Sequence, residues 1–585
     1  MVRGGSFAPS VGKTLRMRYV ALACDYDGTI AHDGAVSENV VEAMARLKES
    51  GRRLLLVTGR ELDDLGEAFD RIEIFDRVVA ENGAVLFDPA TREVRTMAEP
   101  PPDAFVETLR SKGVEPLSVG RVIVATWEPH QEAVLQAIHD LGLELQVIFN
   151  KGAVMVLPAL VNKASGLHGA LEELGLSPHD VVGVGDAEND HSFLDLCELS
   201  VAVDNALSAV KEHCDHVTEG SHGEGVTELI EALLEDDLED LDERVRRHDI
   251  PIGTRRDAEP VLIRPYRTNV LITGPSGSGK STLTTGILEQ LAQRGYQFCL
   301  IDPEGDYDDL DGVVVLGSAE RAPTVDEAID VLADPRSNLV LNLLGVRLDD
   351  RPGFLDKVLP RLQERRTATG RPHWLVIDEA HHLLPAGLQT AEMSMPRDVA
   401  SLILVTVHAD AMAPDALKPV NVVLTPGKGA GESLRVFAKA AAVDLDAPGE
   451  RDADDDDAVC WFVGDDPFAY RPIQPAADLK RHRRKYAEGD LEEDAFYFTG
   501  PDDRLHLRVQ NLMLFAQIGE GIDEETWTWH LQRGDYEKWF RDANGDDEIA
   551  DLVAELAGVD DAKGTRRRII EAIEEKYTLP AEAAK

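Results

Sequence analysis

The sequence predicts an α/β protein of several domains, and three observations lead to this prediction. In two separate stretches, apolar strand-like runs alternate with helical patterns, which is typical of parallel sheets covered by helices. In both stretches, glycines and polar residues follow the strand-like runs directly, at the sheet edge where such folds bind ligands. The chain has 585 residues, which leaves room for about three or four domains.

The first stretch, residues 18–235, is predicted to form a Rossmann-like domain after a lead-in over 1–17. Its strand-like runs lie at 19–24, 54–58, 181–185 and 201–203, with a helical run at 37–50 that Gly51 ends. Residues 84–158 break this alternation, because they combine strand-like pieces with a helical run at 131–141. We therefore predict a small α+β cap inserted over about 84–158.

The second half of the chain is predicted to hold a charged linker, a second α/β domain and a small end domain. Residues 236–261 are dense in charge, and a new domain is predicted over 262–480. Its elements are strands at 269–273, 298–302, 339–343 and 374–378, a helix at 281–294, and an acidic solvated loop at 452–457. Residues 490–585 are predicted to form an α+β domain whose tryptophans make its core; a stacking surface is the alternative.

The composition disfavours nucleic acid and membranes as partners. The formal net charge of -48 disfavours nucleic acid as a partner, because an acidic surface repels polyanions. No apolar run approaches the roughly 18 residues of a membrane span, so no membrane partner is predicted. The five cysteines are scattered without a CxxC pair, and we predict a reduced, cytoplasmic location.

The first candidate site begins at the end of the first strand-like run. Asp25 and Asp27 stand there two residues apart, followed by Gly28 and Thr29. One carboxylate can attack phosphorus to form an acyl phosphate, while the second protonates the leaving oxygen and later activates water. Further candidates follow in order along the chain, and most of them stand at the ends of other strand-like runs, namely Thr58, Gly59, Lys163, Asp186, Asn189 and Asp190. They supply phosphate-oxygen donors and carboxylates for a divalent cation.

These motifs resemble those of haloacid-dehalogenase-superfamily phosphatases of the Cof-like, type IIB group, whose C2 cap lies between Thr58 and Lys163. The resemblance covers about residues 18–235. It implies Asp25 as nucleophile, Asp27 as acid/base, and Thr58 and Lys163 as phosphate binders, with Gly59 and Asn189 beside them. It implies a Mg²⁺ ion held by Asp25, the Asp27 carbonyl and Asp186, with Asp190 as a further ligand. Such caps close over small phosphorylated metabolites, here a sugar phosphate or a phosphoglycolate-like compound.

The second candidate site is a glycine-rich loop between a strand and a helix, where backbone N–H groups cradle nucleotide phosphates. The loop and helix start consist of Gly274, Pro275, Ser276, Gly277, Ser278, Gly279, Lys280, Ser281 and Thr282. Lys280 is expected to reach the terminal phosphates of ATP, and Ser281 to help hold Mg²⁺. Asp378 and Glu379 end an apolar strand, so Asp378 is expected to act on the metal and Glu379 to polarise the attacking water.

The loop, the acidic pair and the run at 302–307 resemble HerA/FtsK-like ATPases of the RecA-like class. The resemblance covers about 262–430, and it implies ATP hydrolysis and assembly into a homo-oligomeric ring. Where relatives end the next strand with Thr-Gln, this chain has Val407-His408. We expect the rings of His381 and His382 to point apart and to serve packing or capping. An arginine finger from a neighbouring chain is expected among Arg361, Arg365, Arg366 and Arg397.

The primary prediction is an Mg²⁺-dependent phosphomonoester hydrolase fused to an ATP-binding and ATP-hydrolysing module that regulates or assembles it. One alternative is a HerA-like motor on nucleic acid with an accessory phosphatase. Another is a scaffold whose P-loop senses ATP. The acidic charge favours the first and third over the second.

Overall fold

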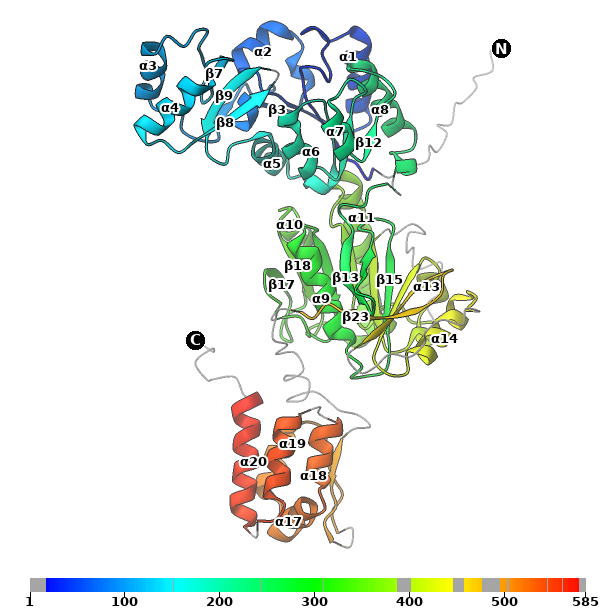
Figure 1. The fold of residues 1–585 in the computed structure, drawn as a ribbon. Coiled ribbons are helices and arrows are strands. Elements are labelled where there is room, and N and C mark those ends of the chain that lie inside the picture. The colour runs from blue at the N-terminus through cyan, green and yellow to red at the C-terminus, as the bar shows by residue number, and fades with distance from the viewer. Residues whose placement is uncertain are drawn as a thin grey trace, which may run out of the picture. The chain divides into compact units, whose positions relative to one another are not determined.

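A computed structural model gives the structure of the chain (Figure 1). It describes residues 17–150, 152–241, 244–308, 310–386, 401–445, 457–475, 495–501, 504–543, 546–559 and 561–577. The chain divides into two compact units, Met1–Ile301 with Gly312–Gln474, and Asp302–Asp311 with Pro475–Lys585. Outside the described residues lie 1–16 of the predicted lead-in, 452–456 of the predicted acidic loop, and Arg397. Asp457, the last residue of that predicted solvated loop, is described and is buried.

An eight-stranded sheet forms the centre of the N-terminal domain, in the order β12-β11-β10-β1-β2-β3-β4-β5. Its strands are β1 (Ala21–Cys24), β2 (Arg53–Val57), β3 (Arg77–Ala80), β4 (Val85–Phe87), β5 (Val94–Thr96), β10 (Val181–Gly185), β11 (Leu199–Ala202) and β12 (His216–Val217). The strands from β12 to β3 pair in parallel, and β4 and β5 add antiparallel pairs. Every residue of β1 and β10 is buried, as expected of strands covered on both faces.

Helices surround this sheet, in agreement with the predicted Rossmann-like class. They are α1 (Glu38–Glu49), α2 (Leu62–Ala68), α5 (Lys163–Leu174), α6 (His191–Leu196), α7 (Ser208–His213) and α8 (Gly223–Glu235). In α1 the buried residues recur at helical spacing, from Val40 through Met44 to Leu47. The carboxyl ends of β1, β2 and β10 lie side by side because these strands are parallel neighbours.

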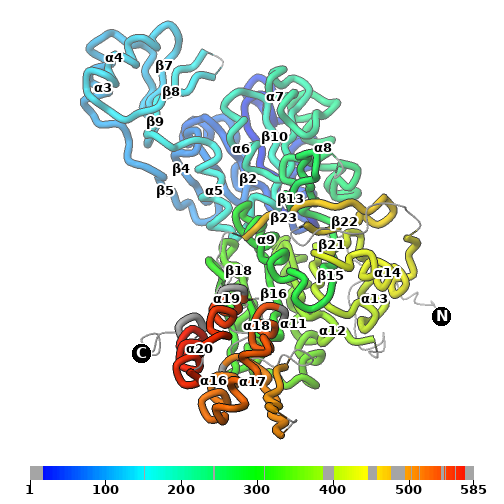
Figure 2. The backbone as a smooth tube through the Cα atoms, turned by 60° about the horizontal axis from the view of Figure 1, so that its bottom comes forward, coloured from blue at the N-terminus to red at the C-terminus, as the bar shows by residue number. Residues whose placement is uncertain are grey.

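The cap has its own sheet, in the order β6-β7-β9-β8, and forms a separate lobe in Figure 2. Its elements are α3 (Asp103–Ser111), β6 (Ser118–Val119), β7 (Val124–Trp127), α4 (Gln131–Leu141), β8 (Leu145–Asn150) and β9 (Ala153–Pro158). The structure corrects the predicted start of the cap near residue 84. β4 and β5 follow that position but extend the core sheet, since Val85 and Leu86 pair with β3.

The P-loop domain is built on an eleven-stranded sheet, in the order β14-β13-β23-β22-β21-β15-β20-β19-β16-β18-β17. Its strands are β13 (Ile250–Arg255), β14 (Pro260–Ile263), β15 (Asn269–Thr273), β16 (Phe298–Asp302), β17 (Val313–Leu316), β18 (Asn338–Asn342), β19 (Trp374–Ile377), β20 (Leu402–Thr406), β21 (Val422–Pro426), β22 (Ala458–Phe462) and β23 (Phe468–Pro472). Its helices are α9 (Lys280–Gln293), α10 (Val325–Val331), α11 (Arg351–Thr369), α12 (Ala380–Leu383), α13 (Pro414–Leu417) and α14 (Ala430–Ala441). The predicted strands and the predicted first helix are confirmed.

The predicted charged linker over 236–261 differs from the structure. Part of it forms β13 and β14, which pair antiparallel and join the second sheet through β23. Ile250 and Ile252 are buried at alternate positions, although charged residues stand on both sides of this strand. Alternation of period two is enough to bury one face of a strand, and the surrounding charge obscured it in the sequence.

The described part of the end domain combines a two-stranded sheet with helices, as predicted. Its elements are β24 (Phe496–Phe498), β25 (Leu507–Val509), α16 (Leu512–Gly521), α17 (Glu524–Gln532), α18 (Asp535–Lys538), α19 (Asp547–Leu556) and α20 (Ala562–Tyr577). Trp527 and Trp539 are buried with Phe515 and Tyr536 in one aromatic core. The prediction that the aromatic residues make a core is confirmed for these side chains.

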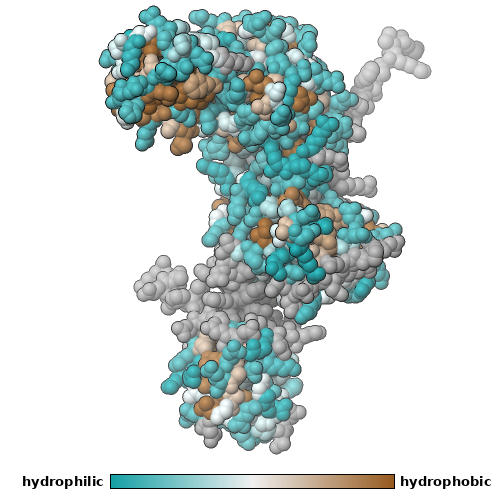
Figure 3. Space-filling model, in the orientation of Figure 1, coloured by the Kyte–Doolittle hydropathy of each residue, from teal (hydrophilic) through white to brown (hydrophobic). Residues whose placement is uncertain are grey.

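The surface is mainly hydrophilic on the face drawn in Figure 3, with apolar patches on the cap. Exposed large apolar side chains of the cap include Trp127, Phe149 and Leu160. No helix among the described residues is long and apolar enough to cross a membrane.

Gly83 of the core packs closely against the start of α5, and this close approach gives a test of the fold. Its φ is +100°, and an added Cβ would lie 1.8 Å from the carbonyl oxygen of Asn162. Gly113 also has a positive φ, of +73°, but a Cβ there meets nothing within 4 Å. Gly113→Ala should therefore cost about 1 kcal/mol, and Gly83→Ala about 1 to 3 kcal/mol more because of overpacking. Calorimetric unfolding of both variants measures the difference, and equal losses would contradict this packing.

Candidate active sites

The first site lies where β1, β2 and β10 end. Asp25 follows β1, Thr58 follows β2, and Asp186 follows β10, so three predicted residues share one edge of the sheet. Asp190 ends the short helix η4 (Glu188–Asp190), and Lys163 opens α5. The side chain of Asn162 caps α5 by accepting a hydrogen bond from the Ser165 N–H, which fixes the helix start that carries Lys163.

Lys163 joins two carboxylates at the centre of this site. Its Nζ donates to Oδ1 of Asp25 and to Oδ1 of Asp190, both at 2.5 Å. Oδ2 of Asp190 accepts hydrogen bonds from the N–H groups of Asp186 and Ala187, both at 2.9 Å. Asp190 therefore positions both the ammonium group and the backbone that carries Asp186.

Three buried carboxylates crowd around one ammonium group. Ligand oxygens of Asp25, Asp186 and Asp190 lie within 4.8 Å of one another. Burial and the neighbouring Asp190 raise the pKa of Asp25, while Lys163 works against this rise. Burial alone would lower the pKa of Lys163, but Asp190 and Asp25 raise it, so Lys163 is charged. Since one positive charge faces three acids, the site suits a divalent cation with oxygen ligands.

Asp27 stands beside this cluster, 46% exposed at its side chain, in an ion pair that the sequence did not predict. Nε and Nη2 of Arg60 donate to its two oxygens, both at 2.7 Å. The Arg60 N–H also donates to Oγ1 of Thr58 at 3.1 Å. Arg60 was visible in the run Thr58-Gly59-Arg60, but nothing in its spacing distinguished a site residue from a surface charge.

The side chain of Asn189 bonds Asn82, which lies between the core sheet and the cap, rather than the carboxylate cluster. Its Nδ2 donates to Oδ1 of Asn82 at 2.9 Å, and Nδ2 of Asn82 contacts the Met155 sulfur on β9 at 2.9 Å. A Cβ on Gly59 would approach the same Asn82 side chain to 3.3 Å. Asn82 thus links Asn189 and Gly59 to the cap. Its backbone has a positive φ of 52°, which could not be predicted from the sequence.

Glu81, the residue before Asn82, bonds the cap through its side chain. Its buried carboxylate accepts hydrogen bonds from three successive N–H groups of the segment between β6 and β7, those of Arg121, Val122 and Ile123, at 2.8 to 2.9 Å. These bonds hold the cap sheet in a fixed relation to β3 and therefore to the site below it.

The second site lies at the start of α9, as the glycine-rich loop predicts. The loop 274–279 joins β15 to α9, with positive φ at Gly277 and Gly279. Nζ of Lys280 donates to the carbonyl oxygens of Gly274 and Pro275, at 3.1 and 2.8 Å. Asp378 directly follows β19, which is separated from β15 by one strand in the sheet order.

A histidine accompanies the acidic pair of the second site. Glu379 has a positive φ of 39°, and its Oε2 lies 3.4 Å from Nδ1 of His381. Nδ1 of His381 also lies 3.1 Å from Oγ1 of Thr406, the last residue of β20. Burial, then the charges of His382 and His408, lower the pKa of His381 to about 4, so its ring is neutral at pH 7.

One expectation for this site is wrong, and one of the four candidates for the arginine finger is bound within its own chain. The rings of His381 and His382 do not point apart, because their centroids lie 4.1 Å from each other. Arg366 is held inside its own chain, where it donates to the carbonyl oxygens of Pro372 and His373 at 2.6 and 2.5 Å. It is thus poorly suited to act as a finger on a neighbouring chain.

The fold and the two sites define a multidomain enzyme with a hydrolase domain of parallel α/β type and a P-loop ATPase domain. A family model for haloacid dehalogenase-like hydrolases matches residues 22–113 and 118–230, and one for AAA domains matches 263–424. Through this first region the chain belongs to the haloacid dehalogenase-like hydrolase family. The predicted fusion is confirmed, while the narrower HerA/FtsK-like grouping stays a prediction.

Curated relatives resemble the first domain over nearly their whole length. The phosphoglycolate phosphatase of Methanothermobacter thermautotrophicus is 33% identical over 223 residues, covering 37% of this chain and 98% of that protein. The phosphoglycolate phosphatase of Haloarcula marismortui is 31% identical over 219 residues, with coverage of 36% and 95%. A solved haloacid dehalogenase-like hydrolase from Bacteroides thetaiotaomicron is 20% identical, with a TM-score of 0.33 and coverage of 37% and 99%.

The double role of Asp190 gives a test of the first site. Asp190→Asn keeps the shape but replaces one acceptor oxygen by an NH₂ group, so a buried donor or Lys163 loses its partner. We expect the free energy of unfolding to fall by about 1 to 3 kcal/mol. Asp204→Asn is the matched control, because Asp204 pairs with Lys211 at the surface. Equal unfolding of the two variants in urea would refute the assigned role of Asp190.

Proposed function

We propose that the first domain hydrolyses phosphomonoesters through an aspartyl phosphate on Asp25. The observation that carries this proposal is the contact of Lys163 with both Asp25 and Asp190 beside Asp186, at the carboxyl edge of a parallel sheet. A positively charged group next to a buried carboxylate can neutralise an incoming phosphate, whose approach the acids would otherwise repel. The family of the domain and the names of its relatives agree with this chemistry.

The proposed reaction proceeds in two steps. An oxygen of Asp25 attacks phosphorus, the bond from phosphorus to the leaving oxygen breaks, and Asp27 gives a proton to that oxygen. Asp27 then takes a proton from a water molecule, which attacks phosphorus, breaks the acyl phosphate bond and releases inorganic phosphate. Arg60 orients Asp27 through its paired hydrogen bonds. Thr58 and Lys163 bind the phosphate oxygens, with Gly59 lining the site.

The buried acids fit a Mg²⁺ ion. Asp25, Asp186 and Asp190 would hold it, since their oxygens converge and one ammonium group does not balance them. When bound, the ion supplies positive charge that draws electrons from the phosphate.

The proposed substrate is a small phosphorylated metabolite. Phosphoglycolate is supported by the names of two relatives that are 33% and 31% identical, and a sugar phosphate is the alternative. We assign this choice to the cap sheet and its apolar side chains, because the core residues of this site are proposed to bind the phosphate.

We propose that the second domain binds and hydrolyses ATP and thereby regulates or assembles the first domain. Lys280 and the loop before it would bind the phosphates, Ser281 and Asp378 would hold Mg²⁺, and Glu379 would polarise water. Assembly into a ring through this domain stays a prediction, as does the cytoplasmic location.

Asp25→Asn tests the phosphatase. The amide is a far weaker nucleophile than the carboxylate, so turnover of p-nitrophenyl phosphate and phosphoglycolate should fall by about a thousandfold or more. ATP hydrolysis should be unchanged, and EDTA should abolish the wild-type turnover until Mg²⁺ is added back. Asp33→Asn, in the exposed turn that follows, is the control. Wild-type turnover in Asp25→Asn would exclude Asp25 as the nucleophile.

Lys280→Ala tests the nucleotide site and the motor alternative together. The variant should lose ATP hydrolysis while keeping phosphatase turnover without nucleotide. Because the chain carries a net charge of -48, we expect duplex DNA to leave wild-type ATP hydrolysis unchanged at 50 mM salt. Stimulation by DNA that disappears as salt rises would instead support the motor.

A further inference from the structure

The connector between α9 and β16 contacts the segment that leads into β10. The ring of His179, in the short helix η3 (Pro178–Asp180), stacks on the Tyr296 ring with centroids 3.8 Å apart. Nε2 of His179 lies 2.7 Å from the carbonyl oxygen of Arg294, the residue that ends α9. Nδ1 of His179 and the hydroxyl of Tyr296 both bond Oε2 of Glu198, at 2.8 and 3.0 Å. One buried cluster thus joins the phosphatase domain to the P-loop domain.

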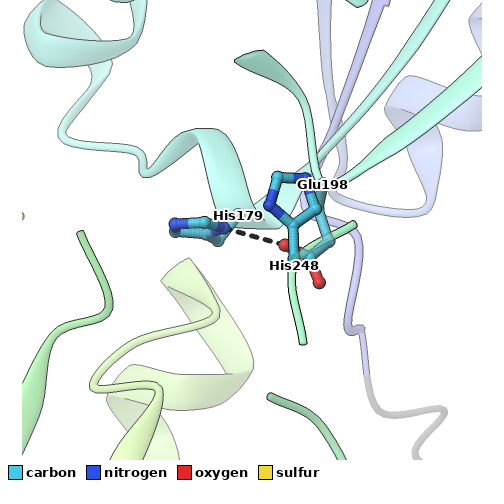
Figure 4. A group of neighbouring side chains, drawn as sticks. All are labelled: His179, Glu198 and His248. Atoms are coloured by element: carbon cyan, nitrogen blue, oxygen red, sulfur yellow. Dashed lines mark hydrogen bonds and ion pairs between the residues drawn. The ribbon is translucent and has the colours of Figure 1, made fainter. Parts of the chain in front are cut away.

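The cluster serves hydrogen bonding rather than metal binding. Figure 4 shows the ring of His179 directed at Glu198, with His248 beside them, and their ligand atoms lie within 4.8 Å of one another. However, both ring nitrogens of His179 already face oxygen acceptors, and Nη2 of Arg18 pairs with Glu198 at 3.1 Å. A metal ion would have to displace these partners beside an arginine.

His179 carries a positive charge in this arrangement. A carbonyl oxygen and a carboxylate oxygen can only accept, so both ring nitrogens must donate. Burial alone would lower the pKa of His179, but the hydrogen bond and charge of Glu198 raise it. Charged hydrogen bonds are the stronger and more directional kind, which makes the contact a firm one.

The elements that leave this cluster lead to the phosphatase site. β10 starts two residues after His179 and ends directly before Asp186, the acid that Asp190 positions. β1 starts at the same level, since the Val20 N–H donates to the carbonyl oxygen of Asp180 at 2.8 Å, and it ends directly before Asp25. A displacement of η3 therefore reaches two of the acids along buried strands.

The opposite direction leads to the nucleotide site. α9 has 14 residues, so it is about 21 Å long, and it begins at Lys280. Nζ of Lys280 bonds two carbonyl oxygens of its own loop, which a nucleotide phosphate must draw it away from. Nucleotide binding would thus act on the start of α9, and Arg294, the residue directly after this helix, has the carbonyl oxygen that bonds His179.

A second contact runs parallel to the first. His373 stands just before β19, and its Nε2 lies 3.5 Å from Oδ1 of Asp180. The N–H of Gln297 donates to Nδ1 of His373 at 2.8 Å, which ties this residue to the same connector. β19 ends directly before Asp378, so the acidic pair of the nucleotide site is also connected to η3.

We propose that nucleotide binding at the P-loop controls the rate of the phosphatase on the same chain through the contact of His179 with Arg294 and Tyr296. This inference rests on the proposed function and names its regulation. A ligand shifts such an equilibrium only by its differential affinity for two arrangements, and the effect is reciprocal. If nucleotide changes the affinity of the phosphatase site for a phosphate analogue, that phosphate analogue changes nucleotide affinity by the same factor.

The test measures kcat/KM for p-nitrophenyl phosphate in the full chain, with and without saturating adenylyl imidodiphosphate and Mg²⁺. We expect a change of about fivefold or more in the wild type, the usual range for such coupling. His179→Leu and the milder Tyr296→Phe should keep the basal rate and the nucleotide Kd but reduce the change to less than about twofold. His139→Leu, an exposed histidine of the cap, should keep the full change.

Each outcome separates the two proposals. Absence of phosphatase turnover in the wild type would refute the proposed function itself. Turnover that nucleotide does not alter would overturn the coupling but leave the phosphatase standing. A nucleotide effect that persists in Lys280→Ala would mean direct competition at the phosphatase site, and one that persists in both His179→Leu and Tyr296→Phe would place the coupling elsewhere. Either result overturns the inference. In the wild type only, orthovanadate should change the Kd of adenylyl imidodiphosphate by the same factor by which adenylyl imidodiphosphate changes the Kd of orthovanadate.

Discussion

The hydrogen bonds of the Lys163 ammonium group to Asp25 and Asp190 are the interaction on which the first site depends. Carboxylates that are this deeply buried repel one another, and without a fixed cation they would protonate or pull apart. The fold supplies that cation from α5, which the chain enters only after completing the cap. The segment that follows the last strand of the cap therefore delivers the lysine that balances the charge of the acids.

The parallel sheets and the acids at their strand ends could be predicted from sequence because buried strands read as continuous apolar runs. Asp25, Asp186 and Lys280 occupy the places that this rule gives them. β13 and β14 escaped it, because half-buried strands amid charges carry a weaker signal. Arg60 and Asn82 could not be assigned either. The role of Arg60 comes from a two-point ion pair with a residue distant in sequence, and the role of Asn82 comes with a left-handed backbone. Neither feature could be predicted from the sequence.

In the hydrolase domain and the P-loop domain, ligand sites and the contact between the domains lie at opposite ends of the strands and helices. Ligand chemistry sits where the strands of each sheet end, while the cluster around His179 sits where β10 starts and where α9 ends. Strand ends at the site tolerate polar side chains because ligands satisfy them. At the other ends the polar groups must satisfy one another, which explains the dense network of Glu198, His179 and Tyr296.

Glu198 belongs by family likeness to the hydrolase, yet one of its hydrogen bonds comes from Tyr296 of the P-loop domain. Asp180 similarly faces His373. Two buried acids of the hydrolase region thus have partners in the P-loop region. The border between the two family regions is therefore not a border of packing, because the polar network that begins in one region is completed by side chains of the other.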